Sequence, residues 1–211
     1  MKEQVERIKY RKVTSVEELQ ALKEQGVDID GVGCIIGVMK RNKIYAVDEV
    51  AKHKGTGIIG EKRRQGELVI DNVVGALVEE MGIEAGDFGD FHYVPGKRGS
   101  YLGRVLIEED GKCGHVDVVL VHYAGRREIF RSANEVRGVG FVNPELLQEY
   151  KNFRRSMLPA MRLINQEGRI RDFNQAAEKR ETLCIFDGVD VETFNREAFI
   201  RKRQELPDLY L

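Results

Sequence analysis

Residues 69–81 constrain the fold of this chain more than any other stretch, because their apolar side chains repeat with a helical period. Ile70, Val73, Val74, Leu77 and Met81 follow one another at i, i+3, i+4, i+7 and i+11. This spacing places them along one stripe of an α-helix that faces a core. Gly82 follows at the place where helices commonly end in the left-handed conformation. The segment therefore predicts a core-packed helix that ends at residues 81–82.

Two neighbouring glutamates, Glu79 and Glu80, lie off this stripe at the carboxyl end of the helix. The negative end of the helix dipole disfavours a carboxylate there by roughly 0.3–1 kcal/mol. A divalent cation would offset that penalty, since Mg²⁺ binds through a few carboxylates together with waters and substrate phosphates. The same pair also fits a solvated helix end, so the helix alone leaves both interpretations open.

A glycine-rich, basic loop is predicted directly before the helix, over residues 55–66. It contains Gly60 and the basic run Lys62, Arg63 and Arg64. Backbone amides and basic side chains in such a loop can hold phosphate groups beside a helix N-terminus. Loop and helix together predict a site for a phosphate and a divalent cation.

Apolar, β-branched runs on both sides of this segment predict the strands of the fold. The strand that contains residues 118–121 is apolar without interruption, which indicates a central position in the sheet. The order hairpin, helix, strands, helix indicates a mixed α/β fold with an antiparallel-leaning sheet. The predicted strands are residues 32–39, 43–47, 101–108, 115–123 and 136–142.

Helices are predicted towards both ends of the chain. Ser15, with Glu18 three residues later, has the capping-box pattern of a helix start. Asn143 and Pro144 predict the N-cap and first residue of a long helix that runs to about residue 166, with a kink at Pro159. The last part of the chain predicts a mostly helical extension, with a helix at 172–180, a strand at 183–186 and a helix at 191–204.

The segment from Gly60 to Ile83 resembles the Nudix box, the motif of the Nudix hydrolase superfamily. The box consists of Gly, five residues, Glu, seven residues, then Arg-Glu-aliphatic-x-Glu-Glu-x-Gly-aliphatic, and this chain fits it without a gap. The matching residues are Glu67, Leu77, Glu79, Glu80, Gly82 and Ile83. The departures are Glu61 for the first glycine, Gly75 for the arginine and Ala76 for the first glutamate of the helix.

Two flanking blocks extend the resemblance over roughly residues 30–165. Residues 31–47 are similar to the family's opening hairpin, and residues 136–147 resemble its late strand, turn and helix start. The resemblance implies a Nudix-like α/β/α sandwich with a mixed sheet over residues 31–167. An N-terminal arm and helix over residues 1–30 and a C-terminal extension over residues 168–211 would lie outside it.

The resemblance also implies a chemistry. In the family, three helix carboxylates hold Mg²⁺ or Mn²⁺ ions, which bridge a diphosphate and help to generate the attacking hydroxide. Positions 76, 79 and 80 share one helix face, which explains the spacing. The implied metal ligands here are Glu79 and Glu80, and the implied substrate is of the nucleotide type. The implied ligand-binding residues are Gly60, Lys62, Arg63, Arg64 and Glu67.

The departures remove part of this machinery. Ala76 supplies no oxygen, and Gly75 lacks the arginine that in the family resembles a tether for the loop glutamate, here Glu67. Substitutes are expected among Glu128, taken as a catalytic residue, Glu135 and Asp117. Each of these carboxylates is equally compatible with a solvated or turn role. His115 would share the face of Asp117 on a strand, where a structural hydrogen bond is the expected role.

Composition excludes some classes of function and leaves others open. The formal net charge of −1 does not indicate nucleic acid or an anionic membrane as partner. Local arginines such as Arg154 and Arg155 could meet RNA or an acidic partner, or form a solvated face. No run approaches the roughly 20 apolar residues of a membrane span, and the N-terminus has no secretory pattern. Three widely spaced cysteines indicate reduced thiols, so we expect a cytoplasmic protein. Nudix proteins are often dimers, so the resemblance implies a homodimer.

The sequence therefore supports three functions. The first is a Nudix-type hydrolase of a phosphoanhydride in a nucleoside diphosphate linked to another moiety. The second is a catalytically inactive Nudix-fold module that binds a nucleotide or RNA. The third is a scaffold subunit. Glu67, Glu79 and Glu80 favour the first, whereas Gly75 and Ala76 favour the other two.

Overall fold

The computed structural model of the 211-residue chain describes most of the predicted central domain and parts of both flanks. The described residues are 9–13, 21, 29–50, 55–62, 68–81, 83, 85–96, 98–109, 112–126, 136–179 and 182–186.

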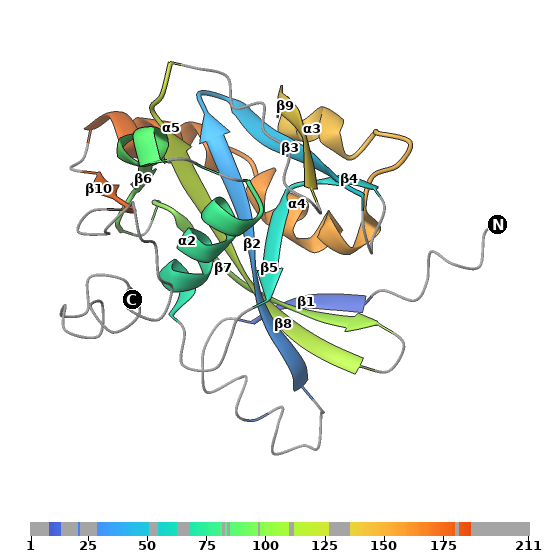
Figure 1. Cartoon of the computed structure of the whole chain (residues 1–211). Coiled ribbons are helices and arrows are strands. Elements are labelled where there is room, and N and C mark those ends of the chain that lie inside the picture. Colours follow the sequence, from blue (N-terminus) through green and yellow to red (C-terminus); the bar gives the residue numbers. More distant parts are fainter. Residues whose placement is uncertain are drawn as a thin grey trace.

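In the part of the chain that the structure describes, ten strands form one mixed sheet at the centre of the fold (Figure 1). They are β1 (Lys9–Val13), β2 (Ile29–Lys40), β3 (Lys43–Glu49), β4 (Gly55–Gly57), β5 (Ile59–Lys62), β6 (Phe91–Tyr93), β7 (Tyr101–Glu109), β8 (Lys112–Tyr123), β9 (Val136–Val142) and β10 (Leu183–Cys184). The main path of the sheet is β1-β7-β8-β2-β3-β4. β2 and β8 pair in parallel, and the other pairs are antiparallel. The sheet is therefore mixed, with a parallel centre and antiparallel flanks.

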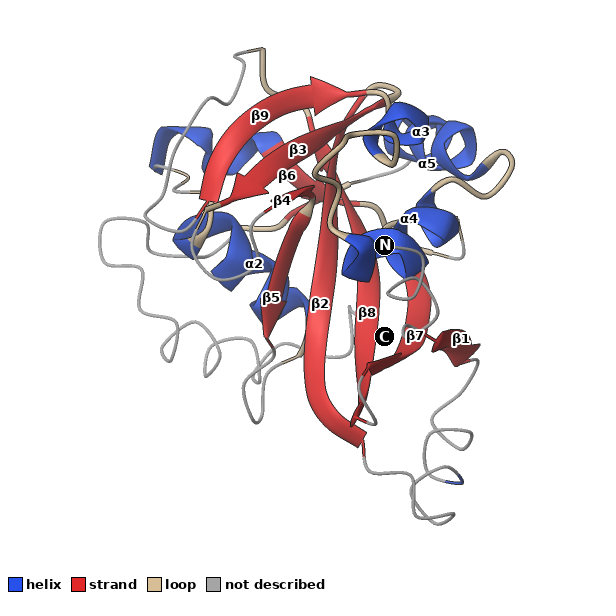
Figure 2. Cartoon of the chain, turned by 90° about the vertical axis from the view of Figure 1, so that its right-hand side faces the viewer, coloured by secondary structure: helices blue, strands red, loops and turns tan. Residues whose placement is uncertain are grey.

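Helices cover both faces of this sheet (Figure 2). α2 (Val69–Glu79) lies on one face, where its buried stripe packs with Ile36, Val119 and Val121. α4 (Leu158–Ile164) and α5 (Arg169–Lys179) lie on the other, where Met161 and Phe173 are wholly buried. The short elements are η1 (Ala85–Asp90), α3 (Pro144–Leu147) and η2 (Arg155–Met157). The expected α/β/α sandwich with a mixed sheet is confirmed.

The strongest sequence patterns correspond to the observed elements. β8 lies between β2 and β7, so the central position predicted from its apolar run is confirmed. The predicted N-cap is also confirmed, because the side chain of Asn143 accepts a hydrogen bond from the Glu145 amide at 3.0 Å. At the end of α2, the amide of Ile83 donates to the carbonyl of Leu77. These contacts depend on short sequence separations, which local patterns describe well.

Two predictions were wrong, and they are connected. The predicted loop at residues 55–66 instead contains β4 and β5, and the predicted long helix from Asn143 ends after α3. The chain after α3 pairs with β4: the Thr56 amide donates to the Asn152 carbonyl at 2.8 Å, and the Arg154 amide donates to the Thr56 carbonyl at 2.8 Å. Backbone that bonds to a strand cannot continue an α-helix. Pro159 lies in the first turn of α4, where proline is tolerated, so it starts a helix and does not kink one.

Several predictions fall on residues that the structure does not describe. These are the helix start at Ser15, the helix at 191–204 and the C-terminal glycine of the box, Gly82. Among the helices that the structure does describe, none has the length and apolar character needed to cross a bilayer.

Candidate functional site

The two neighbouring glutamates at the end of α2 point into different surroundings. Glu79 is exposed, whereas Glu80 is partly buried between α2 and the adjoining strands. Consecutive helical residues are about 100° apart around the axis, so the two side chains point in different directions. Glu80 is the one that faces inward, and the site is built around it.

The carboxyl group of Glu80 meets that of Glu61 from β5. The pKa of Glu80 is raised from 4.5 to about 8, first by burial and then by the hydrogen bond to Glu61 and the charges of Glu61 and Glu49, while the charge of Arg154 acts to lower it. Two carboxyl groups at hydrogen-bond distance cannot both be ionised without a large penalty, so they share a proton. A divalent cation in the place of that proton would remove the penalty.

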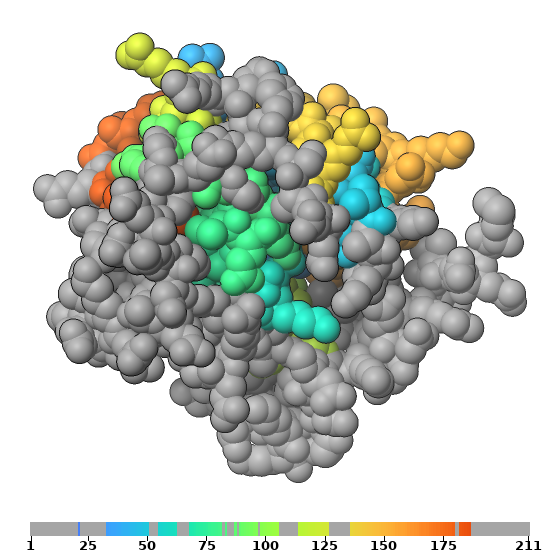
Figure 3. All heavy atoms as spheres, viewed as in Figure 1, coloured from blue at the N-terminus to red at the C-terminus, as the bar shows by residue number. Residues whose placement is uncertain are grey.

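Glu61 faces α2 because of the alternation of side chains along β5. Ile59 belongs to the core under α2, whereas Gly60 faces Met157 on the opposite side of the sheet. A Cβ on Gly60 would lie 3.1 Å from Met157 Cε. The glycine at this position therefore has a packing reason that is independent of any phosphate. The side chain of Lys62 is exposed at the end of the same strand. Atoms of α2 and of β5 lie side by side at the surface in the view of Figure 3.

Arg154 supplies positive charge to this group of acids. Its Nη1 forms an ion pair with Glu49 Oε2, and both side chains are only 16% exposed. Its backbone is fixed on β4 through the hydrogen bonds of residues 152–154 with Thr56. Its side chain runs over two glycines, since a Cβ on Gly55 would lie 3.0 Å from Arg154 Cγ and a Cβ on Gly57 would lie 3.5 Å from its Cδ. The two glycines thus leave the space that the arginine occupies.

The helix positions that depart from the box are buried against the sheet. Gly75 and Ala76 are both buried, and Ala76 has no exposed surface. Ala76 lies on the same helix face as Asn72 and Glu80, one turn from each. The part of the face that would carry a third carboxylate therefore carries a methyl group. Within the described residues, no three His, Cys, Asp or Glu side chains form a ready metal site.

Asp117, one of the expected substitutes, is engaged elsewhere. Its Oδ1 accepts from Tyr101 Oη at 2.7 Å and from Arg104 Nε at 2.9 Å, and its Oδ2 accepts from Arg104 Nη2 at 3.0 Å. In the sheet, Cys34 lies between Asp117 and Glu61, so two strand spacings, about 10 Å, separate the two acids. The hydrogen bond and charge of Asp117 raise the pKa of Arg104. Asp117 is thus the centre of a buried ion pair; His115, two residues before it, is also buried.

The remaining predicted site residues lie outside the described part of the chain. They are Arg63, Arg64, Glu67, Glu128 and Glu135. The structure adds polar and charged side chains that the sequence did not assign to this site, namely Glu61, Glu49, Arg154 and Asn72. A signal existed for Glu61, since an acidic residue stands there in place of a glycine. Arg154 and Glu49 have no local signal, because strand pairing alone brings them together.

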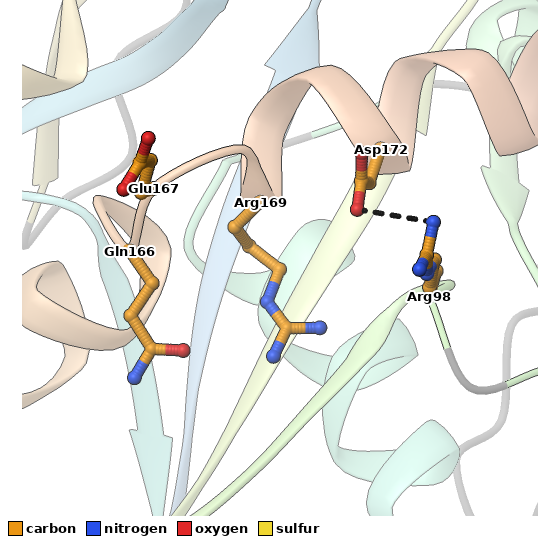
Figure 4. Close-up of a pocket in the computed structure, with 5 residues that line it drawn as sticks. All are labelled: Arg98, Gln166, Glu167, Arg169 and Asp172. Atoms are coloured by element: carbon orange, nitrogen blue, oxygen red, sulfur yellow. Dashed lines mark ion pairs between the residues drawn. The ribbon is translucent and has the colours of Figure 1, made fainter.

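A separate open pocket lies near the start of α5 and is distinct from the Glu80 site (Figure 4). Its volume is about 350 Å³, and the ion pair between Arg98 and Asp172, at 3.5 Å, crosses its edge. Its arginines are balanced by acids, so it offers no excess charge to an anion. The lining residues are Arg98, Gln166, Glu167, Arg169 and Asp172.

Comparisons with known proteins give a resemblance of structure only. No protein-family model matches the sequence, and no curated protein matches it. A NUDIX hydrolase from Nitrosomonas europaea is 14% identical over 72% of this chain and 93% of its own, with a TM-score of 0.48. The Bacillus subtilis pyrophosphohydrolase is 15% identical over 73% and 86%, with a TM-score of 0.45. A hydrolase of the NUDIX family from Clostridium perfringens is 12% identical over 64% and 96%, with a TM-score of 0.43.

Proposed function

We propose that this chain is a Nudix-type protein that hydrolyses a phosphoanhydride in a nucleoside diphosphate linked to another moiety. One observation carries the proposal: Glu80, at the end of the box-like helix, shares a buried site with Glu61 and has a pKa of about 8. Carboxyl groups with strongly perturbed pKa values cluster at functional sites. The resemblance to the Nudix box supports the proposed reaction, and the acid pair supports its proposed location.

The residues of this site fit Mg²⁺ or Mn²⁺. Mg²⁺ typically keeps several waters and takes one or two protein carboxylates together with substrate phosphates, so Glu80 and Glu61 form a sufficient protein contribution. The bound ion would neutralise the diphosphate and lower the pKa of a water. Glu79 is a proposed further ligand. Because it is exposed, it would need a change of rotamer to join the site.

The other residues have proposed roles in binding and positioning. Arg154 forms an ion pair with Glu49 and opposes the negative charge around Glu80. Lys62, with Arg63 and Arg64, would hold substrate phosphates at the end of β5. Glu67 is proposed to bind the same ligand, and Glu128 to act as the catalytic carboxylate that the helix lacks at Ala76.

The test is hydrolysis by the full chain with Mg²⁺ or Mn²⁺ and a panel of dinucleotides, nucleotide sugars and nucleoside triphosphates. We expect metal-dependent turnover that falls at least about 100-fold in Glu80→Gln and Glu61→Gln, since each substitution removes one anionic ligand. Glu79→Gln is the matched control: the same chemical change on the exposed neighbour is expected to reduce turnover about tenfold or less. Equal loss in Glu79→Gln and Glu80→Gln would show that the buried position of Glu80 is not what matters.

A binding module without hydrolysis is the second candidate, and the burial of Gly75 and Ala76 favours it. Because both positions pack in the core, a small rotation of the helix would not bring another side chain into the place of the missing arginine or glutamate. This function predicts saturable nucleotide binding without metal and no turnover in the same panel. The absence of both turnover and nucleotide binding would leave the third candidate, a scaffold subunit.

A further inference from the structure

Asn72, on the inner face of α2, has a buried oxygen atom without a partner. Its side chain has no exposed surface, and its Nδ2 donates to the carbonyl of Lys62 at 3.1 Å. Its Oδ1 accepts no hydrogen bond. Exchanging the positions of Oδ1 and Nδ2 would not solve this, because only Nδ2 can donate a hydrogen bond to the Lys62 carbonyl.

A buried acceptor without a hydrogen bond is unfavourable and rare. Leaving a buried polar atom without a partner costs about 1–3 kcal/mol, and native proteins contain few such atoms. An apolar residue at position 72 would avoid that penalty at the centre of a helix that is otherwise apolar on this side. The oxygen is therefore expected to have a partner that arrives from outside the protein.

The position of Asn72 indicates which partner. Asn72, Ala76 and Glu80 follow one another at i, i+4 and i+8 and so share one face of α2. At one end of this row Glu80 bonds to Glu61, and at the other Asn72 bonds to Lys62, the next residue of β5. Ala76 between them carries only a methyl group. The orphan oxygen therefore lies on the same seam between α2 and β5 as the acid pair.

We infer that Asn72 belongs to the cation site and that its Oδ1 accepts a hydrogen bond from a water in the hydration shell of the divalent ion. The inference rests on the proposed function. Asn72 and Glu80 are about 12 Å apart along the helix axis, which favours contact through water over direct ligation of one ion by both. Amide oxygens and waters are ordinary members of Mg²⁺ and Mn²⁺ surroundings. Asn72 thus supplies an oxygen to the helix face that Ala76 leaves without one.

Asn165, beyond the end of α4, provides a matched control. Its Nδ2 also donates to a backbone carbonyl, that of Pro144, at 3.2 Å, and its Oδ1 is also buried without a partner. It lies with α4 on the other face of the sheet from α2. Replacing it therefore removes the same interactions without touching the seam.

The experiment measures Mn²⁺ binding to the full chain by electron paramagnetic resonance of the free ion. The chains compared are the wild type, Asn72→Ala, Asn72→Asp and Asn165→Ala. We expect Asn72→Ala to bind about tenfold more weakly, in the range typical of groups that orient metal ligands. Asn72→Asp adds a negative charge beside the ion and is expected to bind Mn²⁺ more tightly than the wild type. Asn165→Ala should bind like the wild type.

Thermal unfolding with and without Mn²⁺ provides a second readout that does not depend on activity. Without metal, Asn72→Asp should unfold at a lower temperature than the wild type. Added Mn²⁺ should raise its unfolding temperature by more than that of the wild type, because an ion that binds the folded state stabilises it. If the wild type binds Mn²⁺ and both Asn72 variants bind it with the same affinity, the inference about Asn72 is overturned and the proposed function is not. No Mn²⁺ binding by the wild type would overturn the metal site of the proposed function, and the inference with it.

Discussion

The carboxyl group of Glu80, just beyond α2, is hydrogen-bonded to that of Glu61 on β5. The two residues belong to elements that face each other across the seam between helix and sheet. Each is an acid, so the contact is favourable only while one of them carries a proton or a cation lies between them. The protonation of this pair therefore links the stability of the protein to pH and to metal.

Stability is predicted to fall as pH rises through the pKa of Glu80. The folded state keeps its proton up to a pKa of about 8, whereas an unfolded glutamate releases it near 4.5. The folded protein thus binds more protons between these values, and the stabilisation present below the unfolded pKa is lost as pH rises towards 8. The midpoint of thermal unfolding, measured from pH 5 to pH 9 without metal, should decrease.

Glu80→Gln is the control for this pH dependence. Glutamine keeps a hydrogen-bond donor towards Glu61 and does not titrate. The unfolding midpoint of the variant should therefore fall less with pH, and at pH 9 it should be higher than that of the wild type. Glu79→Gln should keep the wild-type slope, because Glu79 is exposed. If the unfolding midpoint of Glu80→Gln falls with pH as steeply as that of the wild type, groups other than Glu80 cause the decrease. With Mg²⁺ at pH 9 the wild type should regain part of the loss, as the proposed site requires.

Arg154→Met is predicted to destabilise the protein by about 2–3 kcal/mol. It removes the ion pair with the largely buried Glu49. Breaking this pair should cost less than the 3–5 kcal/mol of a fully buried pair, because both side chains are 16% exposed. Arg154→Lys should recover part of the loss, since lysine keeps the charge and loses the planar fork. Urea unfolding measures the free energy of unfolding of both variants. Equal losses of free energy would show that the packing of Arg154, and not its charge, provides the stabilisation.

Some parts of this site could be predicted from sequence, and others could not. The stripe of Ile70 and Leu77 predicts α2 and its inner face, since helical spacing is a local property. The pairing of Glu80 with Glu61 depends on how β5 aligns with Cys34 on β2, a register that no local pattern contains. Arg154 reaches the site only because residues 152–154 add to β4, where the sequence favoured an unbroken helix.

Gly55 and Gly60, both in the predicted loop, should differ in their tolerance of alanine. A Cβ on Gly55 would lie 2.5 Å from the Asn152 carbonyl oxygen, and its φ of +153° is rarely adopted by residues with a side chain. Gly55→Ala should therefore cost about 2–3 kcal/mol and loosen the strand pairing that carries Arg154. Gly60→Ala meets only the flexible end of Met157, at 3.1 Å, and should cost about 1 kcal/mol or less. The two free energies of unfolding, measured side by side, check this order.

Asp117→Asn is predicted to separate structure from chemistry. It removes the charge that pairs with Arg104, whose side chain is 19% exposed, so the free energy of unfolding should fall by about 2–3 kcal/mol, less than for a fully buried pair. Mn²⁺ affinity of the protein that remains folded should equal that of the wild type, because two strand spacings lie between Asp117 and Glu61. Titration of Mn²⁺ at low temperature, where the variant is folded by circular dichroism, makes the comparison. A weaker affinity there would place Asp117 in the metal site, as a substitute for the carboxylate missing at Ala76.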